Sequence, residues 1–268
     1  GTLTIAGGGT DSGLYAVDAG TTLNFSGGTR NLNTGTNVTG LGTLAVSGAT
    51  VNANNLLDIA ATGTALNVSN GVLNVNGSAA SGVLAPVSIS GGTLNFNTTS
   101  AVTLPSLTLS GGELGGTGAV MVTEAFNVTG SSIISGTGTL TTQGVSTVSM
   151  AAGGGFLRII EGKTWVNEGT LTIGDDDYLF FGYVSGGTNT LTNAAGATLN
   201  LSSTAATPLS FYTGTATFNN FGTLNQTATG AHAISGGIAF NNTGTVNVDV
   251  GTLTIAGGGT DSGLYAVD

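Results

Sequence analysis

The chain has 268 residues, of which only 6% are charged, whereas Gly, Thr, Asn and Ser together account for 140. Soluble domains usually carry about 25% charged residues, so this composition excludes most ordinary enzymes, and 48 glycines make long helices costly. The formal net charge of −10 excludes binding to nucleic acid or to an anionic membrane through counterion release.

The hydrophobic content and the lack of cysteine further limit the class of protein to which the chain can belong. Hydrophobic residues make up 40% of the chain, which is enough to bury a core, so we expect an ordered, β-rich protein. No apolar run approaches the roughly 18 residues of a membrane helix, since the nearest one, residues 178–184, is short and contains Gly182. The absence of Cys removes disulfides and thiolate metal sites. It is neutral on the cellular compartment, although it is familiar in large secreted β proteins.

The first 18 residues, GTLTIAGGGTDSGLYAVD, recur letter for letter at residues 251–268. Such self-similarity at a fixed distance indicates a tandem repeat, here with a unit of 250 residues. We expect residues 1–250 to form one repeat unit and residues 251–268 to begin the next identical unit. Residues 1–18 lack the basic start and apolar core of a secretory signal.

A shorter pattern recurs inside the unit: a small turn of Gly, Asn, Ser or Thr precedes four or five residues of the type T-L-x-hydrophobic. Alternation with a period of two predicts strands at residues 1–5, 21–25, 42–46, 64–68, 71–75, 92–96, 169–173, 197–201 and 244–248. Spacings of 20 to 22 residues separate the anchoring leucines Leu3, Leu23, Leu44 and Leu66, and also Leu73 and Leu94. The predicted fold is an all-β, parallel β-solenoid with 20–22 residues per rung. The residues do not determine its handedness, but parallel strands strongly prefer a right-handed connection.

Stacking of rungs explains the composition. Equivalent side chains would repeat about every 4.8 Å, so like charges in one column repel, while columns of Thr, Val or Asn reinforce one another. We expect Leu, Ile, Val and Phe inside, Thr, Ser and Asn outside, and Gly or Asn at the corners. Predicted interior positions near the end of the chain are Phe218, Leu224, Phe240, Val246 and Leu253.

The repeat unit would comprise about 12 rungs and rise roughly 55–60 Å along the solenoid axis. Such a stack has two open edges, which promote aggregation unless something covers them. The sequence shows no capping helix and no charged terminal rung. We therefore expect copies of the same unit to cover each other's edges, end to end.

One stretch departs from the pattern, because charged and aromatic residues gather between residues 150 and 186. We expect a protruding loop or an irregular rung there, with charges that face water and pair with one another. The alternative is a contact patch for surface glycans or for lateral fibre contacts. Its members would be Arg158, Lys163, Trp165, Tyr178 and Tyr183.

The only acidic run, Asp175, Asp176 and Asp177, bears on catalysis and on calcium. Glycoside hydrolysis needs a second carboxylate nearby and lyase chemistry a base; since the sequence offers neither a second acidic cluster nor spare bases, we expect no enzyme and no cofactor. Calcium prefers oxygen ligands, which makes these three residues and Asp11 weak candidates. Asp11 follows a glycine run, but Thr10 replaces the last glycine of the Gly-Gly-x-Gly-x-Asp turn, so a surface turn is the simpler interpretation.

Two further motifs carry no chemistry. Residues 162–164 read Gly-Lys-Thr, yet Leu157 occupies the place of the first glycine of a phosphate-binding loop. His232 is the only histidine, which excludes a multi-histidine metal site.

Three runs carry a resemblance to a known group: FNNTGTVNVDVGTLTIAGGGTDSGLYAVD at 240–268, AGTTLNFSGGTRNL at 19–32 and VTGLGTLAVSGATVNAN at 38–54. The chain resembles very large repetitive bacterial surface proteins, whose better-known relatives are the β-helices of autotransporter passengers and filamentous haemagglutinins. The resemblance lies in pattern and composition and covers most of the chain. It implies export, a right-handed β-helix and a role in adhesion, biofilm matrix or surface fibres, and it supplies no functional residues.

Three functions fit these observations. The first is an extracellular structural repeat whose stacked copies form a stiff fibre or stalk at the cell surface or in a biofilm matrix. The second is a carbohydrate-binding or carbohydrate-cleaving β-helix with a groove around residues 158–183, and the third is a flat threonine array that binds ice or mineral. The 250-residue identity, together with the rung pattern, favours the first.

Overall fold

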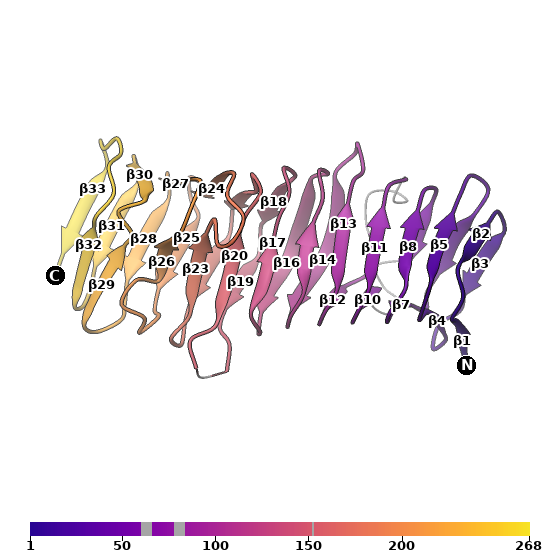
Figure 1. Cartoon of the computed structure of the whole chain (residues 1–268). Helices are drawn as coiled ribbons and strands as arrows, with labels where there is room; N and C mark the ends of the chain where they lie inside the picture. Colours follow the sequence, from indigo (N-terminus) through magenta and orange to yellow (C-terminus); the bar gives the residue numbers. More distant parts are fainter. Residues whose placement is uncertain (60–65, 78–83, 152) are drawn as a thin grey trace. The chain divides into compact units, whose positions relative to one another are not determined.

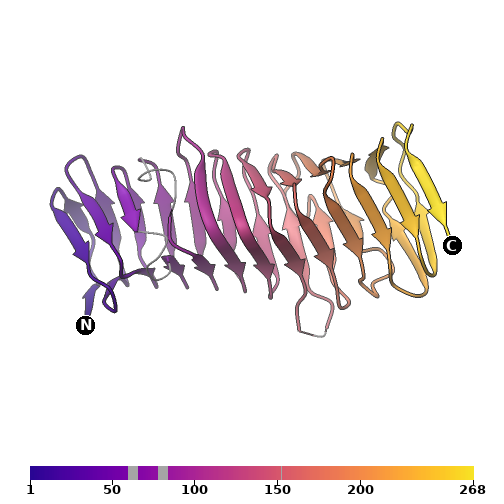
Figure 2. The ribbon, with the colours of Figure 1, turned by 180° about the vertical axis from the view of Figure 1, so that it is seen from behind.

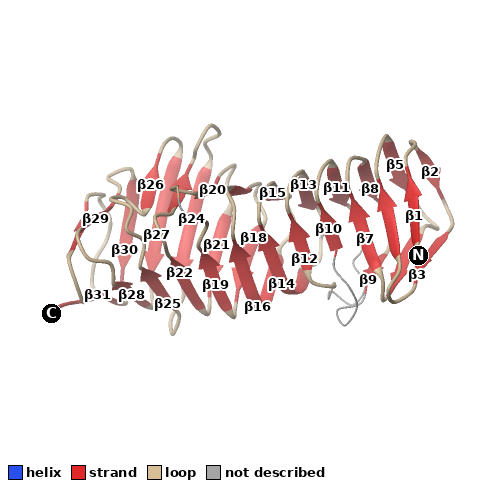
Figure 3. Cartoon of the chain, turned by 90° about the horizontal axis from the view of Figure 1, so that it is seen from below, coloured by secondary structure: helices blue, strands red, loops and turns tan. Residues whose placement is uncertain are grey.

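The computed structural model describes residues 1–59, 66–77, 84–151 and 153–268. The described residues form β-strands joined by loops and turns, with no helix among them (Figure 3). The chain is an all-β parallel solenoid, as predicted. Contacts divide it into two units, Gly1–Thr123 and Glu124–Asp268. Each unit has about six turns, so the chain has about 12.

Each turn of the first unit lays its strands beside the strands of the turns before and after it (Figure 1). One face carries β1 (Thr2–Ile5), β4 (Thr22–Phe25), β7 (Thr43–Val46), β10 (Leu66–Val68), β12 (Val87–Ile89) and the end of β14 (Val102–Leu109). A second face carries β2 (Gly9–Asp11), β5 (Thr29–Leu32), β8 (Thr50–Ala53), β11 (Val72–Val75), β13 (Thr93–Phe96) and β15 (Glu113–Gly115). The third face carries β3 (Leu14–Val17), β6 (Asn37–Gly40) and β9 (Leu57–Ile59).

The second unit repeats this arrangement, and its strands are seen from the opposite side in Figure 2. One face carries β17 (Ser132–Ile134), β20 (Phe156–Ile159), β23 (Tyr178–Phe181), β26 (Leu209–Phe211), β29 (Ala231–Ile234) and β32 (Thr252–Ile255). Another carries β18 (Thr139–Thr142), β21 (Thr164–Asn167), β24 (Thr188–Asn193), β27 (Thr215–Asn220) and β30 (Ile238–Asn242). The third carries residues 125–128 of β16 (Val120–Val128), then β19 (Val145–Val148), β22 (Thr170–Ile173), β25 (Thr198–Leu201), β28 (Thr223–Gln226), β31 (Thr245–Val248) and β33 (Leu264–Val267).

The register confirms the predicted anchors in the first unit. Partners in successive turns are Leu3, Leu23, Leu44 and Leu66, and also Leu73 and Leu94. Turns in the second unit reach beyond the predicted 20–22 residues, since Thr170 pairs with Thr198, 28 residues further on. Of the strand predicted at 64–68 the last three residues are described, whereas residues 64 and 65 lie outside the described residues.

The core follows from alternation within each strand, because every second side chain points into the solenoid. Phe218, Leu224, Phe240 and Val246 are buried as predicted, and Leu253, in the last turn, is half-buried. Burying such a side chain contributes about 1.5–3 kcal/mol, and stacking places the same contact in turn after turn. The charged stretch shares this regularity, since β20 to β23 show the same alternation, so the expectation of an irregular rung was wrong for residues 156–181.

Candidate functional site

The acidic run lies in the corner between β22 and β23, where Asp177 serves as a structural acceptor. Its side chain is buried, and its carboxylate accepts backbone N–H bonds from Met150 at 2.6 Å and from Gly155 at 2.8 Å. Burial raises the pKa of Asp177 above its ordinary value; the two N–H bonds oppose this rise, and the charges of Asp175 and Asp176 add to it. Asp177 therefore fixes the loop of the preceding turn.

The other two aspartates hold the same loop. Asp175 accepts a bond from the Ser149 hydroxyl at 2.5 Å, and Asp176 accepts one from the Gly153 N–H at 3.4 Å. Across the residues that the structure describes, no three His, Cys, Asp or Glu side chains gather where they could hold a metal ion. The acidic run thus joins two neighbouring turns through hydrogen bonds.

Outward-facing side chains near this corner form an aromatic cluster around one guanidinium. Its members are Phe156, Arg158, Tyr178, Phe180, Tyr183 and Tyr212. The guanidinium carbon of Arg158 lies 4.6 Å from the ring centroid of Phe156 and 4.7 Å from that of Tyr183, which is cation–π geometry. The structure therefore brings together three residues of the predicted contact patch, Arg158, Tyr178 and Tyr183.

Sequence reasoning missed the other members of the aromatic cluster, Phe156, Phe180 and Tyr212. The register pairs Phe156 with Tyr178 and Arg158 with Phe180 across neighbouring turns. The two-residue alternation of these strands was the available signal, because it places both members of each pair on the outer face.

Two predicted members of the contact patch lie in the interior instead. Trp165 is 0% exposed; its ring packs edge-to-face on Phe126 at 5.5 Å, and its indole N–H donates to Thr142 Oγ1 at 3.1 Å. Lys163 is 3% exposed. Their assignment to a surface patch was wrong, because the alternation of β21 turns Trp165 inward.

Asp11 is held in an ionic contact between the first two turns. Its carboxylate accepts bonds from Arg30 Nε at 2.6 Å, Arg30 Nη2 at 2.5 Å and the Tyr15 hydroxyl at 3.0 Å. Arg30 Nη1 also donates to the carbonyl of Gly8 at 3.2 Å. Burial and the hydrogen bond to Asp11 raise the pKa of Tyr15, so its hydroxyl stays a donor at neutral pH.

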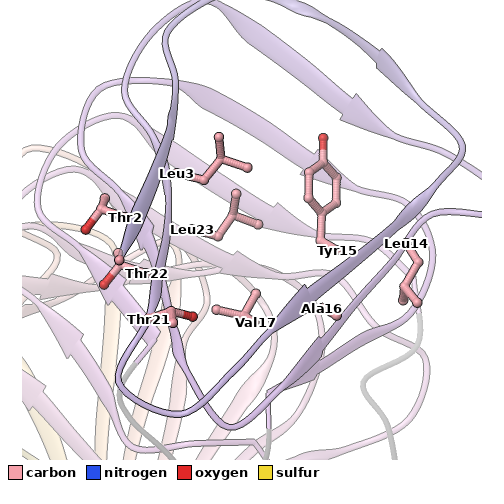
Figure 4. A pocket seen from close by; sticks show the side chains of 10 residues that line it. Thr2, Leu3, Leu14, Tyr15, Ala16, Val17, Thr21, Thr22 and Leu23 are labelled. Atoms are coloured by element: carbon pink, nitrogen blue, oxygen red, sulfur yellow. The ribbon is translucent and has the colours of Figure 1, made fainter.

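A cavity of about 450 Å³ opens where the first turn leaves the core uncovered. Leu3, Leu23 and Tyr15 point into it (Figure 4). Leu3 is 56% exposed although its stacking partner Leu23, one turn on, is 3% exposed. The cavity therefore lies against apolar side chains of the first two turns.

Asparagine ladders connect the turns. On the surface of the first unit one ladder runs through Asn31, Asn52, Asn74 and Asn95 and another through Asn33, Asn54, Asn76 and Asn97, with amide-to-amide distances of 2.8–2.9 Å. In the second unit a buried ladder runs through Asn167, Asn193, Asn220 and Asn242, with distances of 2.8–2.9 Å.

The buried ladder corrects the expectation that Asn belongs outside or at corners. Asn167, Asn193 and Asn220 also donate to the carbonyls of Thr198, Thr223 and Thr245. In the sequence, the feature that could have indicated this ladder is an Asn shortly before the corner glycine, as in Asn-Glu-Gly, Asn-Phe-Gly and Asn-Thr-Gly.

Comparisons with protein-family models, with curated proteins and with solved structures find no match to this chain. Among the described residues there is also no helix that could cross a membrane.

Proposed function

We propose that this protein is a non-catalytic structural repeat of an exported fibre or stalk, in which the solenoid turns of one copy continue those of the next. The fibre would serve surface attachment or the building of a biofilm matrix.

The two copies of the 18-residue segment carry this proposal. Residues 1–18 stack on the turn that follows them, and residues 251–268 stack on the turn that precedes them. The same sequence thus stacks on a following turn in one copy and on a preceding turn in the other, and a continuous array requires both contacts.

The cross-turn bonds supply the mechanical reason. Backbone ladders join successive turns, and asparagine ladders run through four consecutive turns of a column. Stacked ladders of this kind resist local opening. With 6% charged residues, such a fibre offers few groups whose attraction salt could screen.

Fibre diffraction and electron microscopy of a chain carrying several copies of residues 1–250 test the proposal. We expect straight filaments and an axial reflection near ~4.8 Å. Globular particles without that reflection would contradict the proposal.

The aromatic cluster favours a second candidate function, the binding of glycans, because aromatic rings beside a guanidinium suit the apolar and hydroxyl faces of a sugar. A glycan array that compares the unchanged chain with Tyr183→Ala and Tyr212→Ala tests it. Loss of a signal in both variants would support glycan binding, and an unchanged array would contradict it.

A further inference from the structure

We propose that the side of residues 1–18 that faces away from the following turn is an interface for residues 231–248 of another copy of this chain. Residues 1–18 of one copy would stack on residues 231–248 of the other in the register that residues 251–268 adopt on residues 231–248 of their own chain. The proposal rests on the proposed function and adds to it a specific, non-covalent contact between copies.

The C-terminal copy of the segment displays the register. β32 pairs with β29 through Ala231 and Thr252, and β33 pairs with β31. The Thr252 N–H donates to the carbonyl of Gly230 at 2.8 Å, and the Leu264 N–H donates to that of Gly244 at 2.9 Å.

The N-terminal copy uses the opposite side of the same backbone. The carbonyl of Gly1 accepts from Thr22 at 2.9 Å, and that of Val17 accepts from Gly42 at 2.8 Å. Neighbouring residues of a strand direct their backbone groups to opposite sides. Thr2 and Leu14, the counterparts of Thr252 and Leu264, therefore direct their N–H groups to the side on which the described residues place no strand.

Glycines give an independent argument for a turn with two neighbours. A Cβ at Gly7 or Gly13 would meet nothing within 4 Å. At the counterparts it would collide, 1.8 Å from the carbonyl oxygen of Ile238 at Gly257 and 2.4 Å from that of Gly244 at Gly263. Gly7 and Gly13 thus need to be glycine only if another turn packs against them, as the preceding turn packs against Gly257 and Gly263.

The reverse holds for the neighbouring glycine. A Cβ at Gly8 would lie 2.8 Å from the carbonyl oxygen of Thr29 in the following turn, whereas one at Gly258 would meet nothing within 4 Å. In neither copy does each of these glycines approach another turn closely. All of them would do so in a segment that lies between a preceding and a following turn.

The aspartate of the segment can contact a preceding and a following turn at the same time. Asp11 bonds to Arg30 of the following turn, and Asp261 accepts from Asn242 Nδ2 of the preceding turn at 3.4 Å. Tyr15 and Tyr265 each donate to their own aspartate. In a stacked pair of copies the aspartate would therefore lie between an amide and a guanidinium.

The same docking would close the cavity of Figure 4. Ile234 and Val246 oppose Ile255 and Tyr265 in the register of the last turn. In a second copy these two side chains would face Ile5 and Tyr15 and cover the open core. The burial of apolar surface there favours association.

In the chain of 268 residues the required partner surface is already occupied, because residues 251–268 cover residues 231–248. Release of this terminal segment should therefore permit docking. The doubly substituted chain Thr252→Pro/Leu264→Pro removes two of the backbone N–H donors of that contact, places a proline ring in each of its two strands and leaves residues 1–250 unchanged.

Sedimentation velocity over a concentration series tests the inference. We expect the unchanged chain to stay monomeric and the released chain to form end-to-end oligomers as its concentration rises. Adding Gly7→Ala/Gly13→Ala to the released chain should abolish the oligomers. The matched addition Thr2→Ala/Thr4→Ala, which alters exposed side chains, should leave them intact.

Disulfide crosslinking fixes the register, since the chain has no cysteine of its own. In the released chain, Thr4→Cys with Ala233→Cys should form linked dimers, because paired Cα atoms of neighbouring strands lie within disulfide range. Thr4→Cys with Ala231→Cys, two residues out of register, should link far more slowly.

A folded but monomeric released chain would overturn the inference, as would equal crosslinking of both cysteine pairs. If the proline substitutions disturb folding by circular dichroism, Gly257→Ala/Gly263→Ala provides a second released chain with the same expectations. Filaments from covalently joined copies alongside a monomeric released chain would retain the proposed function and reject only this interface.

Discussion

At the scale of single residues, the buried asparagines join neighbouring turns of the second unit through several hydrogen bonds each. The Asn193 amide donates to Asn220 Oδ1 at 2.8 Å and to the Thr223 carbonyl at 3.0 Å, and Asn193 Oδ1 accepts from Asn167 at 2.9 Å. Each side chain therefore satisfies polar groups of two neighbouring turns. A buried polar group that loses its partner costs about 1–3 kcal/mol.

We expect Asn193→Ala to lower the free energy of unfolding by at least about 2 kcal/mol, because it leaves more than one buried partner unpaired. Asn225 occupies an outer ladder and is half-buried, so Asn225→Ala should cost less than about 1 kcal/mol. Denaturant titration of both variants measures the difference. Equal losses would show that burial of the ladder is not what makes it strong.

Asp177 gives a prediction for pH. Between the ordinary pKa of 3.8 and its raised value, the folded chain keeps a proton that the unfolded chain has lost. Stability from this group is therefore greatest at low pH, falls as the pH rises through that window, and then levels off. The Tm of the unchanged chain minus that of Asp177→Asn should decrease from pH 3 to the plateau. A difference that grows with pH would contradict the raised pKa.

At the scale of strands, the alternation and the leucine spacing located nine of the strands, namely β1, β4, β7, β10, β11, β13, β22, β25 and β31. They predicted the stacking of Leu3 on Leu23 and of Leu23 on Leu44, because inward leucines at a constant spacing leave little choice of register. They did not predict the longer turns of the second unit, since corner residues add length without changing the pattern within the strands.

The candidate site was less accessible to sequence reasoning. Composition suggested that an aromatic residue in a charged stretch would be exposed, but the strand rule applied to Thr164, Trp165 and Val166 directs the middle one inward. The aromatic cluster depends on which turns neighbour each other, and Tyr183 meets Tyr212 only because a whole turn lies between them in sequence.

Corner glycines test how closely the turns approach. Gly182 and Gly196 have similar positive φ values of 73° and 83°. A Cβ at Gly182 would lie 1.7 Å from the carbonyl oxygen of Thr213, whereas one at Gly196 would meet nothing within 4 Å.

We expect Gly196→Ala to cost about 1–2 kcal/mol of stability from backbone strain alone, and Gly182→Ala to cost clearly more, because strain and collision add. Thermal unfolding of the two variants measures this. Similar Tm values would mean that the corner at Gly182 can relax away from the next turn.

At the scale of the whole molecule, a solenoid behaves as a one-dimensional stack in which each turn depends on its neighbours. Amide hydrogen exchange in this chain should therefore be fastest at residues 1–18 and 251–268, which each stack on one turn, and slowest in interior turns such as those of β22 and β25. Exchange measured by mass spectrometry checks this order. Uniform protection along the chain would contradict nearest-neighbour stacking.

Cryo-electron microscopy of a chain in which residues 1–250 are followed directly by residues 1–268 would show whether one copy continues the solenoid of the other. We expect Asp11 of the second copy to lie between Asn242 of the first copy and Arg30 of its own, within unbroken ladders. A gap, an unpaired edge or a different register at that junction would contradict it.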